Sequence, residues 1–303
     1  MERTGMPQIP GAVKLSYSSY GDPHLPTLIL VMGLGTPAAA WPKAFIAELV
    51  RQGLHVVTPD NRDSGLSPKI RYSVSRVEVA SRIAAYLAGM AVTAPYRLEE
   101  MAADIEAVMD AIGVERAHVA GISLGGMIGQ VLAFRAPHRV MSLTCISSAT
   151  GNPKTGLGHM EAILSILKEP PKGAGREQLR AYMRSMMKSI GTPGETYADE
   201  DLDAITDVME RGRVTPECGA RQLLAMLASG NRSRQLQQLS VPALVIHGTE
   251  DPLLPVQAGE EIARLIPGAR FKAFEGMGHD LPQRLQKEIA GLIAEHCYRG
   301  ALR

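Results

Sequence analysis

Short apolar runs rich in β-branched residues alternate with segments of helical periodicity along most of this chain. Strands are predicted at 27–32, 55–59, 117–122, 140–147, 243–247 and 270–274. Amphipathic helices are predicted between them at 38–52, 98–112, 124–135, 256–265 and 282–296. Near-continuous apolar strands separated by helices are typical of a parallel sheet covered on both faces, so the pattern predicts an α/β fold. An alternating stretch at 13–22 predicts an additional antiparallel strand or hairpin.

This alternation stops between residues 150 and 239. Helical patterns continue there, without a convincing strand, at 160–168, 178–190, 202–211 and 216–229. The segment opens with Gly- and Pro-rich linker chemistry at 151–156. We therefore interpret 150–239 as a helical cap or lid inserted over the carboxyl edge of the sheet. The core domain then consists of a first part at 1–149 and a second part at 240–303.

Composition and charge narrow the class of protein. The chain has 303 residues, enough for one large α/β domain or two small ones. Its 32 Lys and Arg against 31 Asp and Glu give a net charge of +1, with no basic excess to favour nucleic acid or an anionic membrane. The first residues lack the apolar region of a signal peptide, and the three cysteines are scattered. We expect a cytoplasmic protein without a nucleic-acid or membrane partner.

The hexapeptide Gly-Ile-Ser-Leu-Gly-Gly at 121–126 lies where a predicted strand passes into a predicted helix. So sharp a turn leaves no room for a Cβ at positions 121 and 125, and it holds Ser123 in a strained backbone conformation. The serine hydroxyl is thereby raised to the edge of the sheet at a helix N-terminus, with the Leu124 amide facing the same space. Ser123 is the candidate nucleophile.

A serine nucleophile needs a base, usually an imidazole oriented by a carboxylate. His279 lies in a glycine-containing loop after the last predicted strand, at the sheet edge where open α/β sheets bind ligands. Asp251 follows the strand at 243–247 and is the candidate acid, with the adjacent Glu250 as the alternative. The three candidates follow one another along the chain as serine, aspartate and histidine. One class of hydrolases has its nucleophile, acid and base in this order.

A loop after the first long strand completes the predicted site. Gly33 and Gly35 allow the backbone to turn so that the amide of Leu34 faces the same point as the amide of Leu124. Two such donors form an oxyanion hole, each stabilising the transition state by about 3 kcal/mol. Because every one of these residues follows a parallel strand, we expect the fold to bring them together.

With these motifs the chain resembles enzymes of the α/β-hydrolase fold over nearly its whole length. It is most similar to an esterase-like branch that includes methyl esterases acting on polyketides, marked by Asp-Asn-Arg-Asp-Ser-Gly-Leu-Ser at 60–67 and by Trp41-Pro42 near the Gly-Leu-Gly loop. The resemblance implies the site just described: nucleophile Ser123, acid Asp251, base His279, and an oxyanion hole of the Leu34 and Leu124 amides. At the position of Met32, many members of this branch have a histidine. A methionine side chain cannot donate the hydrogen bonds with which that histidine would brace the loop.

The expected function is that of a carboxylesterase forming an acyl-enzyme intermediate, with no cofactor and no metal ion. Its substrate is expected to be a small-molecule ester, uncharged and hydrophobic, contacted by Gly33, Trp41 and Met160. The same triad also serves hydrolysis of lactones, thioesters or carbon–carbon bonds, and peracid formation. A ligand-binding protein with little turnover is the alternative from another class.

Other polar residues and motifs have structural interpretations. Asp60, Arg62 and Asp63 are expected to pair among themselves and with the oxyanion loop, and Asp280 is expected to interact with the start of the last helix. The segment 33–38, with Asp60 about 20 residues further on, is close to a dinucleotide-binding fingerprint. That alternative leaves the 121–126 motif and the acid and base unexplained.

Overall fold

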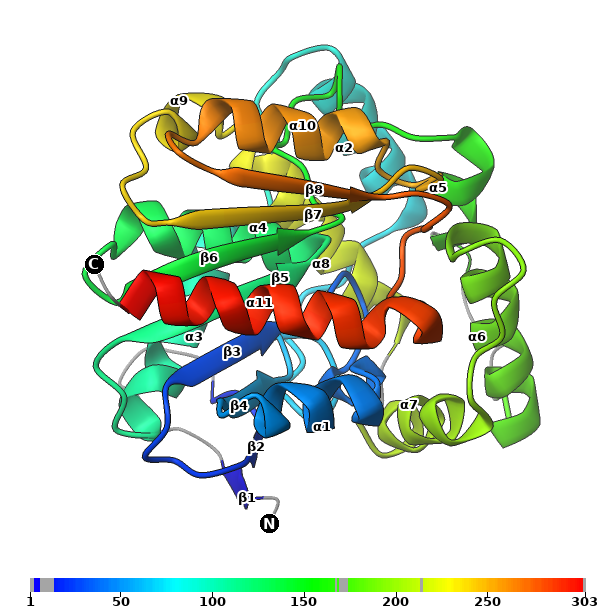
Figure 1. The fold of residues 1–303 in the computed structure, drawn as a ribbon. Coiled ribbons are helices and arrows are strands. Elements are labelled where there is room, and N and C mark those ends of the chain that lie inside the picture. The colour runs from blue at the N-terminus through cyan, green and yellow to red at the C-terminus, as the bar shows by residue number, and fades with distance from the viewer. Residues whose placement is uncertain (1–2, 6–13, 167, 169–173, 213–214, 302–303) are drawn as a thin grey trace.

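A computed structural model describes residues 3–5, 14–166, 168, 174–212 and 215–301. Its strands form one sheet in the order β1-β2-β4-β3-β5-β6-β7-β8 (Figure 1). From β3 to β8 all neighbours are parallel, whereas β1 and β2 are antiparallel additions at one edge. The strands are β1 (Arg3–Gly5), β2 (Tyr17–Tyr20), β3 (Thr27–Val31), β4 (His55–Pro59), β5 (Ala117–Ile122), β6 (Val140–Ile146), β7 (Ala243–Gly248) and β8 (Arg270–Phe274).

Both faces of the sheet are buried, as the apolar strands predict. In β3, Leu28 and Leu30 pack on one side of the sheet, and Ile29 and Val31 pack on the other. The first face is covered by α1 (Lys43–Arg51) and α11 (Gln286–Ala301). The opposite face is covered by α3 (Leu98–Ala111), α4 (Leu124–Arg135) and α10 (Val256–Leu265). The fold is thus the expected α/β architecture.

The segment between β6 and β7 is helical throughout the part of it that the structure describes. Its helices are α5 (Met160–Ile166), α6 (Arg176–Ile190), α7 (Asp199–Gly212), α8 (Pro216–Ser229) and α9 (Ser233–Leu236). Helices α5, α6 and α7 lie beyond the carboxyl ends of the strands (Figure 1). Helix α8 packs against α3 and against α2 (Arg76–Leu87), and α9 packs against α4 and α10. Helices α5, α6 and α7 thus lie at the end of the sheet where the strands have their carboxyl ends (Figure 1).

Prolines mark where two of the predicted helices begin, and one of these helices is divided. The segment 38–52 contains a short 3₁₀ turn, η1 (Ala38–Ala40), and α1 begins only after Pro42. The helix predicted at 282–296 starts directly after Pro282, with a 3₁₀ turn, η2 (Gln283–Leu285), that is continuous with α11. Proline lacks an N–H group and therefore stands at helix starts. No helix in the described ranges is both long and apolar enough to cross a membrane.

Candidate active site

Ser123 occupies the sharp turn between β5 and α4. It is the N-cap residue of α4 with φ 55° and ψ −120°, a strained conformation for any residue except glycine. The backbone is held from β6: the Ser123 amide donates to the Ile146 carbonyl (2.8 Å), and Ser148 Oγ donates to the Ser123 carbonyl (2.8 Å). A Cβ on Gly121 would lie 2.1 Å from the carbonyl carbon of Gly125, so the turn requires glycine there. This is the geometry that the hexapeptide predicts.

Asp251 and His279 form a buried pair after β7 and β8. Asp251 Oδ2 accepts a hydrogen bond from His279 Nδ1 (2.7 Å), and Oδ1 accepts the amides of Leu253 and Leu254 (2.9 Å each). His247 Nε2 lies 3.5 Å from the same Oδ2. Between the two adjacent acids, the structure thus pairs Asp251 with His279 and leaves Glu250 exposed.

The surroundings of Asp251 keep this carboxyl group ionised. Burial by itself would raise the pKa of Asp251, but the nearby His279, together with hydrogen bonds from His247 and His279, holds that pKa well below its usual range. An ionised carboxylate at Nδ1 fixes the orientation of the imidazole and stabilises its protonated form. Nε2 of His279 is then the ring nitrogen left for proton transfer.

The loop after β3 lies directly against the serine. A Cβ on Gly33 would be 3.4 Å from Ser123 Cβ, so the backbone of this loop lies against Ser123. Leu124 is the first residue of α4, so its N–H has no partner within the helix. Leu34 is half-buried in the loop. The two residues predicted to supply oxyanion-hole amides therefore flank Ser123 on separate elements.

Side chains from elsewhere brace the loop after β3, to which Met32 offers no side-chain hydrogen bond. Asn61 Nδ2 donates to the Met32 carbonyl (2.9 Å). The Ala38 amide donates to Asp60 Oδ1 (2.7 Å), and the Gly35 amide donates to Gln222 Oε1 (2.7 Å). Sequence analysis missed Gln222, which lies 187 positions from Gly35 and belongs to no motif.

The segment 60–67 has different partners from those expected. Asp60 binds the oxyanion loop, which confirms that part of the prediction. The expectation that Arg62 and Asp63 pair with each other is wrong: Arg62 forms a bidentate ion pair with Asp104 on α3 (2.6 and 2.8 Å). Asp63, at φ 65°, instead forms one with Arg221 on α8 (2.9 and 2.6 Å). The two charges face different helices, so each has a separate buried partner.

Asp280 also differs from its prediction, because it does not bind the start of the last helix. Oδ1 accepts the amide (3.1 Å) and the hydroxyl (2.6 Å) of Thr192, and Oδ2 accepts the Tyr197 hydroxyl (2.6 Å). The His279 amide donates to the Ile190 carbonyl (2.8 Å). The carboxylate of Asp280 lies beside the connection between α6 and α7, and the hydrogen-bond donors of that connection occupy both of its oxygens. The loop that carries His279 is therefore fastened to that connection.

The three candidates for substrate contact occupy unlike environments. Gly33 lies against Ser123. Trp41 is 1% exposed and stacks on Phe45 with ring centroids 5.7 Å apart, so its side chain packs in the core. Met160 is 66% exposed at the start of α5. Of the three, Gly33 is the one that the structure places beside Ser123.

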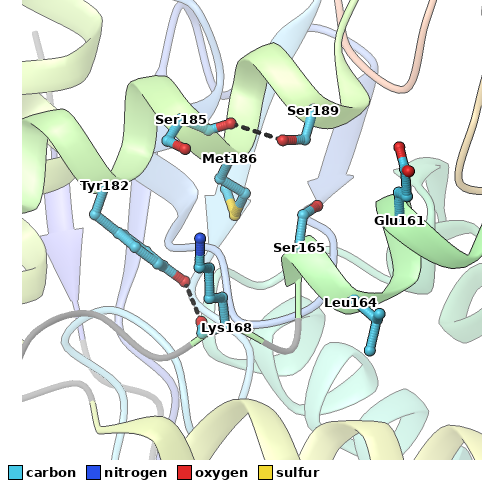
Figure 2. Close-up of a pocket in the computed structure, with 8 residues that line it drawn as sticks. All are labelled: Glu161, Leu164, Ser165, Lys168, Tyr182, Ser185, Met186 and Ser189. Atoms are coloured by element: carbon cyan, nitrogen blue, oxygen red, sulfur yellow. Dashed lines mark hydrogen bonds between the residues drawn. The ribbon is translucent and has the colours of Figure 1, made fainter.

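A separate pocket of about 340 Å³ lies between α5 and α6 (Figure 2). Within it the Tyr182 hydroxyl donates to the Lys168 carbonyl (2.8 Å), and Ser189 Oγ donates to the Ser185 carbonyl (3.0 Å). Its lining residues include no member of the Ser123, Asp251 and His279 set. They are Glu161, Leu164, Ser165, Lys168, Tyr182, Ser185, Met186 and Ser189. Across the described ranges, no group of three or more His, Cys, Asp or Glu could hold a metal ion.

Comparison with known proteins agrees with this architecture. A family model described as the alpha/beta hydrolase fold matches residues 26–180 and 213–282. Rhodomycin D methylesterase of Streptomyces peucetius is 29% identical over 309 aligned residues, which cover 94% of this chain and 95% of the relative.

Two solved structures show the same fold. An esterase of Thermogutta terrifontis superposes with a TM-score of 0.70 at 20% identity, covering 99% of both chains. The 2-hydroxy-6-oxo-6-phenylhexa-2,4-dienoate hydrolase of Rhodococcus superposes with a TM-score of 0.71 at 19% identity, covering 99% of this chain and 100% of that one. The methylesterase and the two structures cover nearly the entire chain, whereas the family model matches on either side of residues 181–212.

Proposed function

The chain belongs to the α/β hydrolase fold family, and from that premise we propose that it is a serine carboxylesterase working through an acyl-enzyme intermediate. The observation that carries the proposal is the buried contact of 2.7 Å between Asp251 Oδ2 and His279 Nδ1. The strained turn at Ser123, on a neighbouring part of the same sheet edge, supports a nucleophilic serine.

In the proposed mechanism, Ser123 Oγ attacks the ester carbonyl carbon and its proton passes to His279 Nε2. Asp251 stabilises the imidazolium that forms. The negative charge on the carbonyl oxygen accepts hydrogen bonds from the Leu34 and Leu124 amides. Collapse of this tetrahedral intermediate breaks the ester C–O bond, and His279 protonates the leaving alcohol. His279 then deprotonates a water molecule, whose oxygen attacks the acyl carbon. Collapse of this second tetrahedral intermediate breaks the bond to Ser123 Oγ, which takes the proton back from His279, and the acid is released.

The proposed substrates are uncharged, hydrophobic esters with a small alcohol group. The similar protein of Streptomyces peucetius is a methylesterase by name, which supports a small leaving alcohol. We propose that α5, α6 and α7 act as a cap over the acyl side, since they lie beyond the carboxyl ends of the strands. The described cysteines are buried and free, which supports action in a reducing compartment such as the cytoplasm.

A series of para-nitrophenyl esters of increasing acyl length tests the proposal. We expect hydrolysis by the native protein, loss to background in Ser123→Ala, and native rates in the control Ser81→Ala, an exposed serine on α2. Turnover that never exceeds that of Ser123→Ala would overturn the esterase proposal. Labelling of Ser123 by a fluorophosphonate without ester turnover would likewise overturn it and assign the activated serine to lactones, thioesters or carbon–carbon bonds.

A further inference from the structure

Gln222 is a fully buried glutamine on α8 whose side-chain oxygen and nitrogen each form a hydrogen bond. Oε1 accepts the Gly35 amide (2.7 Å), and Nε2 donates to the Arg62 carbonyl (2.7 Å). One side chain thus joins the oxyanion loop to the segment that follows β4. Both contacts are made over long sequence separations, 187 and 160 positions.

The oxyanion loop needs such a partner because its backbone is intrinsically free. Gly33 and Gly35 flank Leu34, and Gly35 has φ 66°, so the direction of the Leu34 N–H is weakly fixed by local sterics. Met32 offers no side-chain hydrogen bond to the loop. An oxyanion donor is effective only when it is preorganised toward the developing charge.

Helix α8 is itself firmly placed beside this loop. The neighbour of Gln222, Arg221, forms the buried bidentate pair with Asp63 (2.9 and 2.6 Å). A Cβ on Gly35 would lie 3.9 Å from the Gly219 Cα, so helix and loop are in contact. The amide of Gln222 is therefore presented by a fixed helix, and its orientation is determined by two hydrogen bonds.

We propose that Gln222 is a positioning residue for the oxyanion hole, holding Gly35 so that the Leu34 amide points at the developing oxyanion. This inference rests on the proposed function, in which Leu34 donates to that charge. A side chain from the segment between β6 and β7 thereby orients a loop that follows β3. Gln222 touches neither substrate nor reacting atoms and acts through Gly35.

The test compares Gln222→Met, Gln222→Glu and the control Ser229→Ala in the full-length protein. Met keeps the length of the side chain and loses both hydrogen bonds. A buried Glu favours its protonated form, which reproduces both bonds. Ser229 lies on the same helix and accepts the Leu98 amide of α3 (2.9 Å), so its variant weakens the docking of α8 without touching the oxyanion loop.

Gln222→Met is expected to lower kcat/KM by about 10- to 100-fold, the loss expected for a misdirected donor. Its affinity for an arylboronic acid, which adds to Ser123 as a tetrahedral anion, should fall by the same factor while binding of the product acid is unchanged. Hydrogen exchange at Gly35 should accelerate. Gln222→Glu should recover most of the loss, and Ser229→Ala should remain within about twofold of native.

The experiment distinguishes a failure of the proposed function from a failure of the inference about Gln222. A native protein without ester turnover above Ser123→Ala removes the proposed function and the inference with it. A native protein that is active, but whose Gln222→Met variant matches Ser229→Ala in kcat/KM and in boronate affinity, overturns the inference alone. Equal losses in the Met and Glu variants with unchanged boronate affinity would also overturn it, because the effect would then be one of packing.

Discussion

His279 Nδ1 lies 2.7 Å from Asp251 Oδ2, inside the protein, whereas the neighbouring Glu250 faces solvent. The backbone amides of Leu253 and Leu254 donate to the other carboxylate oxygen of Asp251, and these bonds fix the orientation of the side chain. A one-residue difference in position along the β7–α10 connection thus separates an acid that orients the imidazole from one that does not contact it.

Replacing Asp251 by asparagine should lower kcat by about 10³- to 10⁴-fold, because the neutral amide no longer stabilises the imidazolium or fixes the ring tautomer. Glu250→Gln is the matched control and should stay within about twofold of native. Initial rates on a para-nitrophenyl ester measure both. Full activity in Asp251→Asn together with loss in Glu250→Gln would reverse the assignment.

The network around Asp280 predicts a second effect on turnover. Tyr197→Phe removes a hydroxyl that donates to Asp280, next to His279 in the chain. A hydrogen bond to a charged group contributes about 2 kcal/mol, so partial loss of order in this loop should lower kcat by about 3- to 10-fold with little change in KM. Tyr182→Phe, whose hydroxyl donates to the Lys168 carbonyl, is the control. Equal kinetics in the two variants would contradict the prediction.

The buried pair between Arg221 and Asp63 predicts a large effect on stability. Arg221→Met leaves the Asp63 carboxylate buried without its cation and should lower the free energy of unfolding by about 3 kcal/mol or more. Adding Asp63→Asn should recover part of that loss, since the side-chain oxygen of asparagine is uncharged and still accepts a hydrogen bond from the Ile70 N–H. Urea unfolding checks both variants. Arg51→Ala, which removes an exposed ion pair with Glu48, should leave the midpoint unchanged.

His118 predicts a dependence of stability on pH. Burial, with the neighbouring His296 and Arg116, lowers the pKa of His118 from its ordinary 6.5 to about 4 in the folded protein. As pH falls from 6.5 toward 4, the unfolded chain binds a proton there while the folded protein does not. The contribution of His118 is therefore fully present above pH 6.5 and is lost on acidification, by up to about 3 kcal/mol.

Urea midpoints at pH 7.5, 6.0 and 5.0 measure this dependence. His118→Leu should be less stable at pH 7.5, because it loses the hydrogen bond to Ser142, and should lose less stability on acidification. His138→Gln, at an exposed histidine, should retain the native slope. Parallel curves for native protein and His118→Leu would show that His118 does not titrate as described.

The strand at 117–122 and the turn at Ser123 could be predicted from the sequence because both depend on residues that are near one another along the chain. The run at 117–122 is apolar enough to identify β5, and the glycines around Ser123 are required by the close approach of β5 and α4. Pro42 and Pro282 were present in the sequence as well. The helix predicted at 282–296 does start beside Pro282, whereas Pro42 interrupts the one predicted at 38–52, because proline favours a helix start over a helix interior.

By itself, the sequence determined the order of strands and helices, the parallel two-sided sheet, and which residues follow each strand. These depend on hydrophobic periodicity and turn chemistry within a few residues. Only the tertiary structure decided that Arg62 binds Asp104, that Asp63 binds Arg221, that Asp280 binds Thr192 and Tyr197, and that Gln222 binds Gly35. A buried polar side chain pairs with whichever donor or acceptor helix packing brings within about 3 Å, and for Asp280 and Gln222 that partner lies more than 80 positions away along the chain.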